Sequence, residues 1–185
     1  MKKERKINTR VLVKASFLVA LSIVLTRGLS IMIPLGGAET IRVGFGVVPV
    51  FMSGIMFGPT VGGLTGLVAD LIGFLINPMG GAFHPGITFT KFLEGFIPGL
   101  FGNYYRKNLG QEAYIKYYKI LIAQVISSII TSLILMPIWL IGLFGKESVV
   151  ISYPFRVLNT IVSIAIHSLI VFNILKLFKN EIKGA

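Results

Sequence analysis

The chain has 185 residues, of which 54% are hydrophobic and only 14% are charged, and its mean hydropathy is +0.83. This composition excludes a water-soluble globular domain and leaves room for about six membrane spans of roughly 20 residues each. The net charge of +11 comes mainly from short segments between apolar stretches, so we interpret it as a topology signal and not as a nucleic-acid interface.

Six apolar stretches follow one another, and we expect each to form a transmembrane helix within a single membrane domain, residues 1–185. They cover residues 11–33, 43–57, 59–76, 85–102, 119–144 and 153–178. The first stretch follows a basic run, as in a signal peptide, but it is too long for a signal sequence and we interpret it as a retained helix. The second offers only roughly 15 residues, or about 22 Å of helix, so it should be short or broken near Pro49.

The distribution of Lys and Arg predicts the orientation in the membrane. Residues 1–14 hold six of these residues, residues 103–119 hold four and residues 176–185 hold three. The positive-inside rule places these segments, and therefore both chain termini, on the cytoplasmic side of the cell membrane.

Ionisable residues within the apolar stretches are functional candidates, because a charge in the bilayer needs a partner or a water-filled cavity. Asp70 and Lys91 lie in consecutive spans at a similar depth, about 9 Å below the outer boundary. Glu94 lies one turn after Lys91, where the two could form an internal ion pair. Arg27 also reaches the outer third of its span.

Further polar and aromatic residues gather at the same level. Arg42 begins the second span and Arg156 begins the sixth, although Arg156 could also belong to an interfacial belt. Phe83 and His84 lie in a Gly-rich external loop that could act as a lid. Stacking surfaces beside a carboxylate and cations suit a flat, hydrogen-bonding, anionic organic molecule.

Catalytic and metal-binding motifs are missing from this sequence. It has no Cys, only two His, and no glycine-rich phosphate loop, because Gly145-Lys146 is followed by Glu147. His167 has no carboxylate nearby in sequence, so we interpret it as a packed helix residue. We therefore expect no metal, no cofactor and no enzymatic activity.

Four motifs between Thr26 and Gly102 carry a family resemblance: RVGFGVVP at 42–49, FGP at 57–59, ADLIGFLINP at 69–78 and GGAFHPG at 80–86. They resemble the substrate-binding S components of energy-coupling factor vitamin transporters, and most of all the folate-specific branch. The resemblance implies an all-α protein with six transmembrane helices. Such a subunit captures its vitamin from outside and docks on one coupling membrane protein and two ATPases.

The resemblance also implies roles for individual residues. Asp70 would accept two hydrogen bonds from a pterin ring, with Asn77, Phe83 and His84 beside it. The outer cations would bind the glutamate carboxylates of folate, and these cations are Arg27, Arg42, Lys91 and Arg156. Among them we expect Arg42 and Lys91 to be best placed. The family's Ala-x-x-x-Ala docking motif corresponds to Ser16-x-x-x-Ala20, with Ala15 adjacent.

Two other functions remain open from sequence. One is an S component for a different flat vitamin or precursor, such as riboflavin, thiamine or a queuosine precursor. The other is a small intramembrane enzyme that uses Asp70, Glu94 and His84, although this triplet has no recognised ligand spacing.

Overall fold

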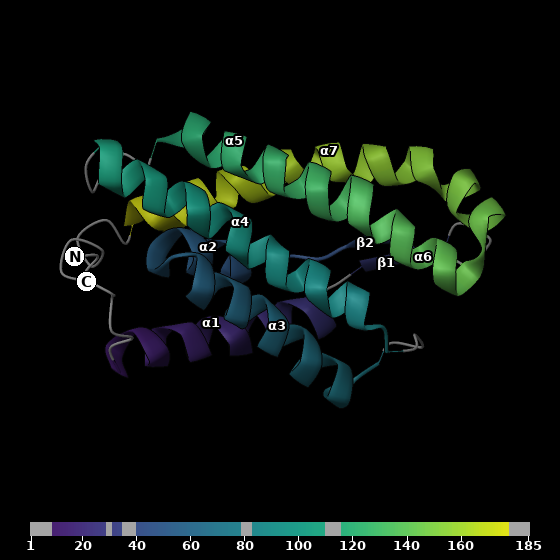
Figure 1. Ribbon diagram of the computed structural model, residues 1–185, viewed down its shortest axis with the longest axis horizontal. Helices are drawn as coiled ribbons and strands as arrows, with labels where there is room; N and C mark the ends of the chain where they lie inside the picture. Colours follow the sequence, from purple (N-terminus) through teal and green to yellow (C-terminus); the bar gives the residue numbers. More distant parts are fainter. Residues whose placement is uncertain (1–8, 29–30, 35–39, 79–82, 110–115, 178–185) are drawn as a thin grey trace.

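The computed structural model describes residues 9–28, 31–34, 40–78, 83–109 and 116–177, and for residues 31–34 and 40–43 it describes the backbone only (Figure 1). Helices dominate these segments. Their bounds are α1 Thr9–Arg27, α2 Val47–Phe57, α3 Pro59–Ile76, α4 Pro85–Leu109, α5 Tyr117–Ser128, α6 Met136–Phe144 and α7 Lys146–Leu177. A π-helical segment, η2 Ile129–Leu135, joins α5 to α6, so these three form one continuous rod.

The six helical rods confirm the predicted all-helical membrane fold. Four of them, α1, α3, the α5–η2–α6 rod and α7, are long and apolar enough to cross a membrane. The other two differ in length and polarity: α2 has only 11 residues, whereas α4 has 25 but includes Lys91 and Glu94. The second helix is therefore short, as expected. It is not broken at Pro49, because that residue lies in its first turn, where no backbone N–H bond is lost.

A β-hairpin corrects the predicted end of the first span. Helix α1 ends at Arg27 instead of Ile33, and strands β1 (Ile31–Pro34) and β2 (Thr40–Val43) pair antiparallel with Ile31 opposite Val43. The β-branched residues of these segments favour extended pairing, and Pro34 cannot continue a helix. The second helix consequently begins at Val47 and not at residue 43.

Two other helices are longer than predicted. Helix α4 continues past Gly102 to Leu109, because the glycine lies against the backbone of Ile55 and does not interrupt the helix. Helix α7 begins at Lys146 instead of Tyr153 and contains Pro154. Glu147 in its first turn stabilises this early start through the helix dipole.

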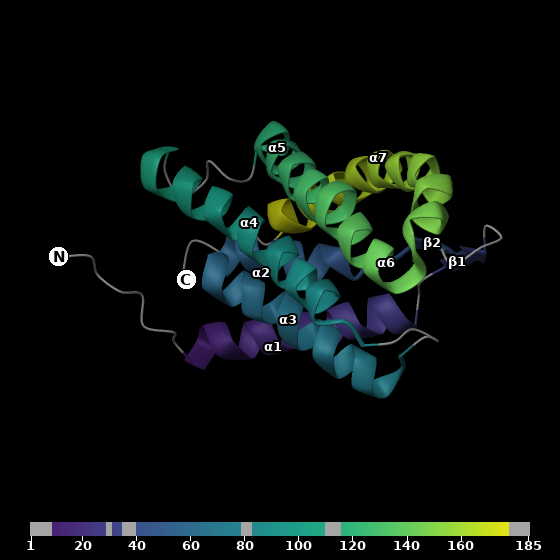
Figure 2. The ribbon, with the colours of Figure 1, turned by 45° about the vertical axis from the view of Figure 1, so that its right-hand side comes forward.

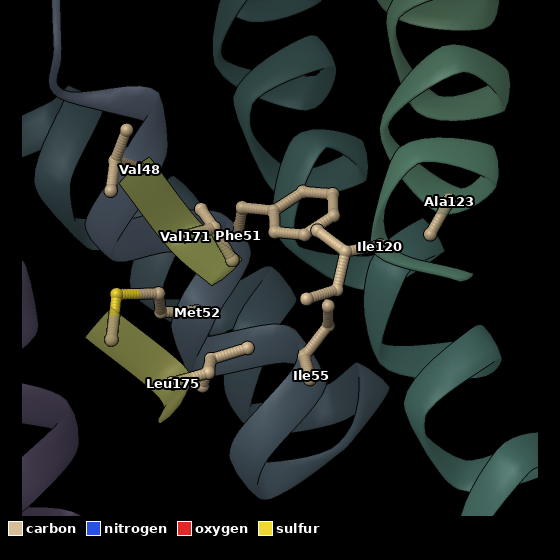
Figure 3. Close-up of a cluster of buried hydrophobic side chains, with 8 residues drawn as sticks. All are labelled: Val48, Phe51, Met52, Ile55, Ile120, Ala123, Val171 and Leu175. Atoms are coloured by element: carbon tan, nitrogen blue, oxygen red, sulfur yellow. The ribbon is translucent and has the colours of Figure 1, made fainter. Parts of the chain in front are cut away.

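The rods form two groups with two helices between them (Figures 1 and 2). Helices α1 and α3 lie on one side, the α5–η2–α6 rod and α7 on the other, and α2 and α4 between. An apolar cluster lies near the end at which α5 begins and α7 ends (Figure 3). Its buried members, here called the inner cluster, are Val48, Phe51, Met52, Ile55, Ile120, Ala123, Val171 and Leu175.

Glycines allow α2, α3 and α4 to pack with their backbones in contact. Gly54, Gly58, Gly62 and Gly66 recur every four residues, a spacing that predicts close approach of α2 and α3 to their neighbours. A Cβ atom at Gly95 of α4 would collide with the carbonyl oxygen of Gly62 in α3, and one at Gly62 would collide with the backbone of Gly54 in α2. The Ser53 and Thr65 hydroxyls hydrogen-bond across α2 and α3 at 2.8 Å. These three helices therefore form a tightly packed unit.

Replacing Gly95 with Ala should destabilise the protein. The added methyl group meets backbone atoms that have no alternative rotamer, so we expect the free energy of unfolding to fall by about 1–3 kcal/mol. Gly142→Ala is the matched control, because a Cβ at Gly142 has no atom within 4 Å. Thermal unfolding in detergent compares the two variants, and equal melting temperatures would contradict the packing argument.

Candidate substrate-binding site

A cavity of about 450 Å³ lies among the helices. Residues from all six rods line it, together with the segment that leads into α2 and residues between α3 and α4. Its volume falls in the range typical of small-molecule sites, about 300–1,000 Å³. Its lining has two chemically different parts, a charged wall and a neutral wall.

The charged wall is formed by Arg27 of α1, Asp70 of α3, and Lys91 and Glu94 of α4. Thr88 donates a hydrogen bond from Oγ1 to Asp70 Oδ2 at 2.7 Å. Arg27 donates from Nη1 to the Asn77 carbonyl oxygen at 2.5 Å, and its guanidinium interacts electrostatically with Asp70. These contacts fix the carboxylate and the guanidinium in place on adjacent helices.

Lys91 and Glu94 form the ion pair that their spacing predicts. Lys91 Nζ donates to Glu94 Oε1 at 2.8 Å and to Oε2 at 2.9 Å, and the two side chains are 28% and 13% exposed. The charge of Lys91 is therefore balanced within α4. Its ammonium is less available to a ligand carboxylate than the sequence suggested.

Aromatic rings join the loop after α3 to helix α6. His84 lies 5.6 Å from Trp139 between ring centroids, and Phe83 packs edge-on against Phe74 at 5.4 Å. Trp139 donates from Nε1 to Thr90 Oγ1 at 3.1 Å. Phe83 and His84 both line the cavity. The rings of Phe83 and His84 thus provide stacking surfaces where the cavity borders the start of α4.

The neutral wall carries hydroxyl, amide and imidazole groups. Its members are Gln124, Ser127, Ser128, Thr131, Ser132, Asn159, Thr160, Ser163 and His167. Ser132 and Thr160 hydrogen-bond at 3.0 Å and so connect η2 to α7. We did not identify this wall from sequence. The available signal was the helical spacing of polar residues at 124, 127, 128 and 131 in an otherwise apolar stretch.

The structure brings together six of the eight ligand-binding residues expected from sequence. These six line the cavity, and they are Arg27, Asp70, Phe83, His84, Lys91 and Arg156. Asn77 ends α3 and contributes its backbone carbonyl to Arg27, but its exposed side chain does not line the cavity. Arg42 belongs to β2, and its side chain lies outside the described residues.

The three expected docking residues of α1 separate into two groups. Ser16 and Ala20 are exposed, whereas Ala15 is buried and packs within the subunit. Only Ser16 and Ala20 therefore offer a surface to another protein.

As for a metal, no cluster of three or more His, Asp or Glu side chains occurs within the described segments.

Comparisons with known proteins agree with this architecture. Residues 6–177 match the family model described as "ECF-type riboflavin transporter, S component". The chain is 34% identical over 173 residues to "Folate transporter FolT" of Clostridium novyi (strain NT), which covers 94% of this chain and 91% of that protein.

Two solved structures share the fold. "Crystal structure of FolT bound with folic acid" superposes with a TM-score of 0.70 at 26% identity, covering 89% of this chain and 92% of that one. "Structure and mechanism of the S component of a bacterial ECF transporter" superposes with a TM-score of 0.61 at 25% identity, covering 92% and 98%.

Proposed function

The chain belongs to the S components of energy-coupling factor transporters, and we propose that it is a multi-pass cell-membrane subunit that captures folate. One observation carries the choice of ligand: the cavity combines the Asp70 carboxylate with the guanidinium groups of Arg27 and Arg156. Folate offers a neutral pterin ring with donor groups and a glutamate tail with two carboxylates. A single ligand can therefore satisfy both kinds of charge.

Asp70 suits the ring. A carboxylate can accept two parallel hydrogen bonds from the amino group and the adjacent ring nitrogen of a pterin. Thr88 already donates to Oδ2, which holds the carboxylate in one orientation, and each carboxylate oxygen has a second lone pair for a ligand. Phe83 and His84 lie along the same cavity and can stack on the ring.

Arg156 suits the tail best, since Lys91 is paired with Glu94 and Arg42 cannot be placed in the site. Arg27, which also interacts with Asp70, is the second candidate. Guanidinium groups bind carboxylates through two parallel N–H donors. The β-hairpin and the Phe83–His84 segment lie at the same end of the bundle as the start of α7, and we assign them the role of a cover over the bound vitamin.

Riboflavin is the second candidate, because the matching family model is described by that vitamin. Riboflavin has no carboxylate, so the ligand itself would offer no anionic group to Arg27 or Arg156. Purifying the protein from cells in detergent and identifying the bound compound by absorbance and mass spectrometry decides between them. A pterin spectrum supports folate, and a flavin spectrum overturns it.

Transport requires an energy source that this sequence does not contain. The chain has no phosphate loop, so we assign ATP hydrolysis to two ATPase subunits that act through a coupling membrane protein. In this assignment the chain binds and carries its ligand without chemical change. Both termini face the cytoplasm, and the cavity opens toward the outside.

Asp70→Asn should weaken folate binding by more than about 1.5 kcal/mol, or more than tenfold in Kd, because a neutral amide cannot accept both ring hydrogen bonds. Thr88 can still donate to the amide oxygen, so the fold should persist. Isothermal titration in detergent measures the change, with Glu147→Gln as an exposed control outside the cavity. Wild-type affinity in a folded Asp70→Asn protein would remove this residue from the site.

Arg156→Gln should separate recognition of the tail from recognition of the ring. We expect folate affinity to fall about tenfold, while affinity for pteroate, which lacks the glutamate, changes by less than about twofold. Lys146→Gln is the control, because this cation is exposed and does not line the cavity. Equal losses for both ligands would show that Arg156 does not bind the tail.

Ser16→Trp or Ala20→Trp should abolish uptake and co-purification with the coupling protein while folate binding remains. Both residues are exposed on α1 and small enough for close approach by another helix. Leu21→Trp, on a different exposed side of the same helix, is the control. Loss of binding together with docking would indicate internal packing, and loss of neither would exclude this face.

A further inference from the structure

Two neutral buried side chains in the cavity each have one polar atom that finds no hydrogen-bond partner among the described residues. Gln124 of α5 is 3% exposed, and its Oε1 atom accepts no hydrogen bond. His167 of α7 is 5% exposed, and its Nε2 atom has no hydrogen-bond partner. Buried polar atoms are nearly always paired, so each of these groups requires an explanation.

Both groups lie at the same closed end of the cavity. Gln124 follows Ala123 of the inner cluster directly, and His167 precedes Val171 of that cluster by one helical turn. Two hydrogen bonds between the α5–η2–α6 rod and α7 lie on either side of them along the helices. One joins the Tyr117 and Ser168 hydroxyls, and the other joins those of Ser132 and Thr160. The inner cluster closes the cavity beyond them. They are therefore the polar groups that a ligand reaches at its deepest point.

The π-helix independently aligns this wall with the cavity. Residues 124, 128, 132, 136 and 140 all line it, although they belong to three consecutive helical segments. In an α-helix of 3.6 residues per turn, each four-residue step drifts by about 40°, so the last residue would lie about 160° from the first. The wider turn of η2 reduces this drift, and so keeps these residues of the rod closer to one face.

We propose that Gln124 and His167 contact the uncharged polar edge of the bound heterocycle, on the side away from Asp70, and thereby determine which ring the site accepts. The proposal rests on the function proposed above. The Gln124 amide oxygen accepts a hydrogen bond, and so does Nε2 of a neutral His167 whose other nitrogen donates to the Gly44 backbone. Two acceptors suit the amino or ring N–H hydrogens that Asp70 leaves unpaired on a neutral heterocycle. The cation that acts electrostatically on His167 is Lys91, which is already paired with Glu94. A carboxylate tail therefore gains little at this wall, and we expect the ring to enter first.

The test compares ligand affinity with the stability of the ligand-free protein. Gln124→Met and His167→Phe remove the polar atoms and keep similar shapes. Each should weaken folate and pteroate alike, by more than about tenfold in Kd, because the ring edge loses its partner. The melting temperature of Gln124→Met without ligand should stay equal or rise, since removing an unpaired buried polar atom removes a destabilising group. His167→Phe also loses the hydrogen bond to the Gly44 backbone, so its stability is compared with that of Gln124→Met.

Ser53→Ala provides the matched control. Ser53 is fully buried and hydrogen-bonded to Thr65, and it lies outside the cavity lining. This variant should show the opposite result, with a lower melting temperature and a folate Kd within about twofold of wild type.

Three results would overturn the proposal. Wild-type affinity in both cavity variants would show that the two groups do not touch the ligand. A lower ligand-free melting temperature with unchanged affinity would show that they are structural. Failure of the unaltered protein to bind either folate or pteroate would overturn the proposed function itself, and with it this inference.

Discussion

The structure depends on one constraint, which is that polar and charged groups inside a hydrocarbon layer must be satisfied within the protein or by what the protein binds. Lys91 and Glu94 satisfy each other within α4, and Asp70 accepts from Thr88. Each of these contacts lies on the cavity and not on the lipid face. Charged side chains within the spans therefore indicate where the cavity lies, because contact with the lipid would be unfavourable for them.

The same constraint explains why the two halves of the bundle differ. Helices α2, α3 and α4 approach each other backbone to backbone through glycines, and the short Ser53–Thr65 bond is buried between them. They hold the charged wall rigidly, which limits the geometry that a ligand can adopt at Asp70. The α5–η2–α6 rod and α7 instead face the cavity with small hydroxyl groups. Many of these bond to carbonyls of their own helix, as Thr131 does to Ser127.

This difference decides how much could be predicted from the sequence. The positions of Asp70, Lys91 and Arg27 were predictable because a charge in an apolar stretch has few stable surroundings. The neutral wall was not, because a Ser or Thr that bonds to its own helix can face lipid, a neighbouring helix or a cavity. These cases differ only in which side of the rod a residue lies on. The π-helical turn of η2 changes the side on which the later residues lie. The hairpin was not predicted for a related reason: residues 31–33 are apolar, and a short apolar run is compatible with a strand as well as with the end of a helix.

Binding through buried groups also has a consequence for release. A ligand that satisfies desolvated polar atoms leaves slowly, because every hydrogen bond it gives up leaves a buried atom unpaired. The chain has no phosphate loop with which to drive that step. S components work with a coupling protein and ATPase subunits, and we expect the energy for release to come from that module. The exposed small residues Ser16 and Ala20 lie on α1, which also carries Arg27 to the cavity. A shift of α1 against its neighbours would therefore move Arg27, for which we propose a role in ligand binding. If Ser16 and Ala20 form the docking surface that we propose, this one helix connects docking with release.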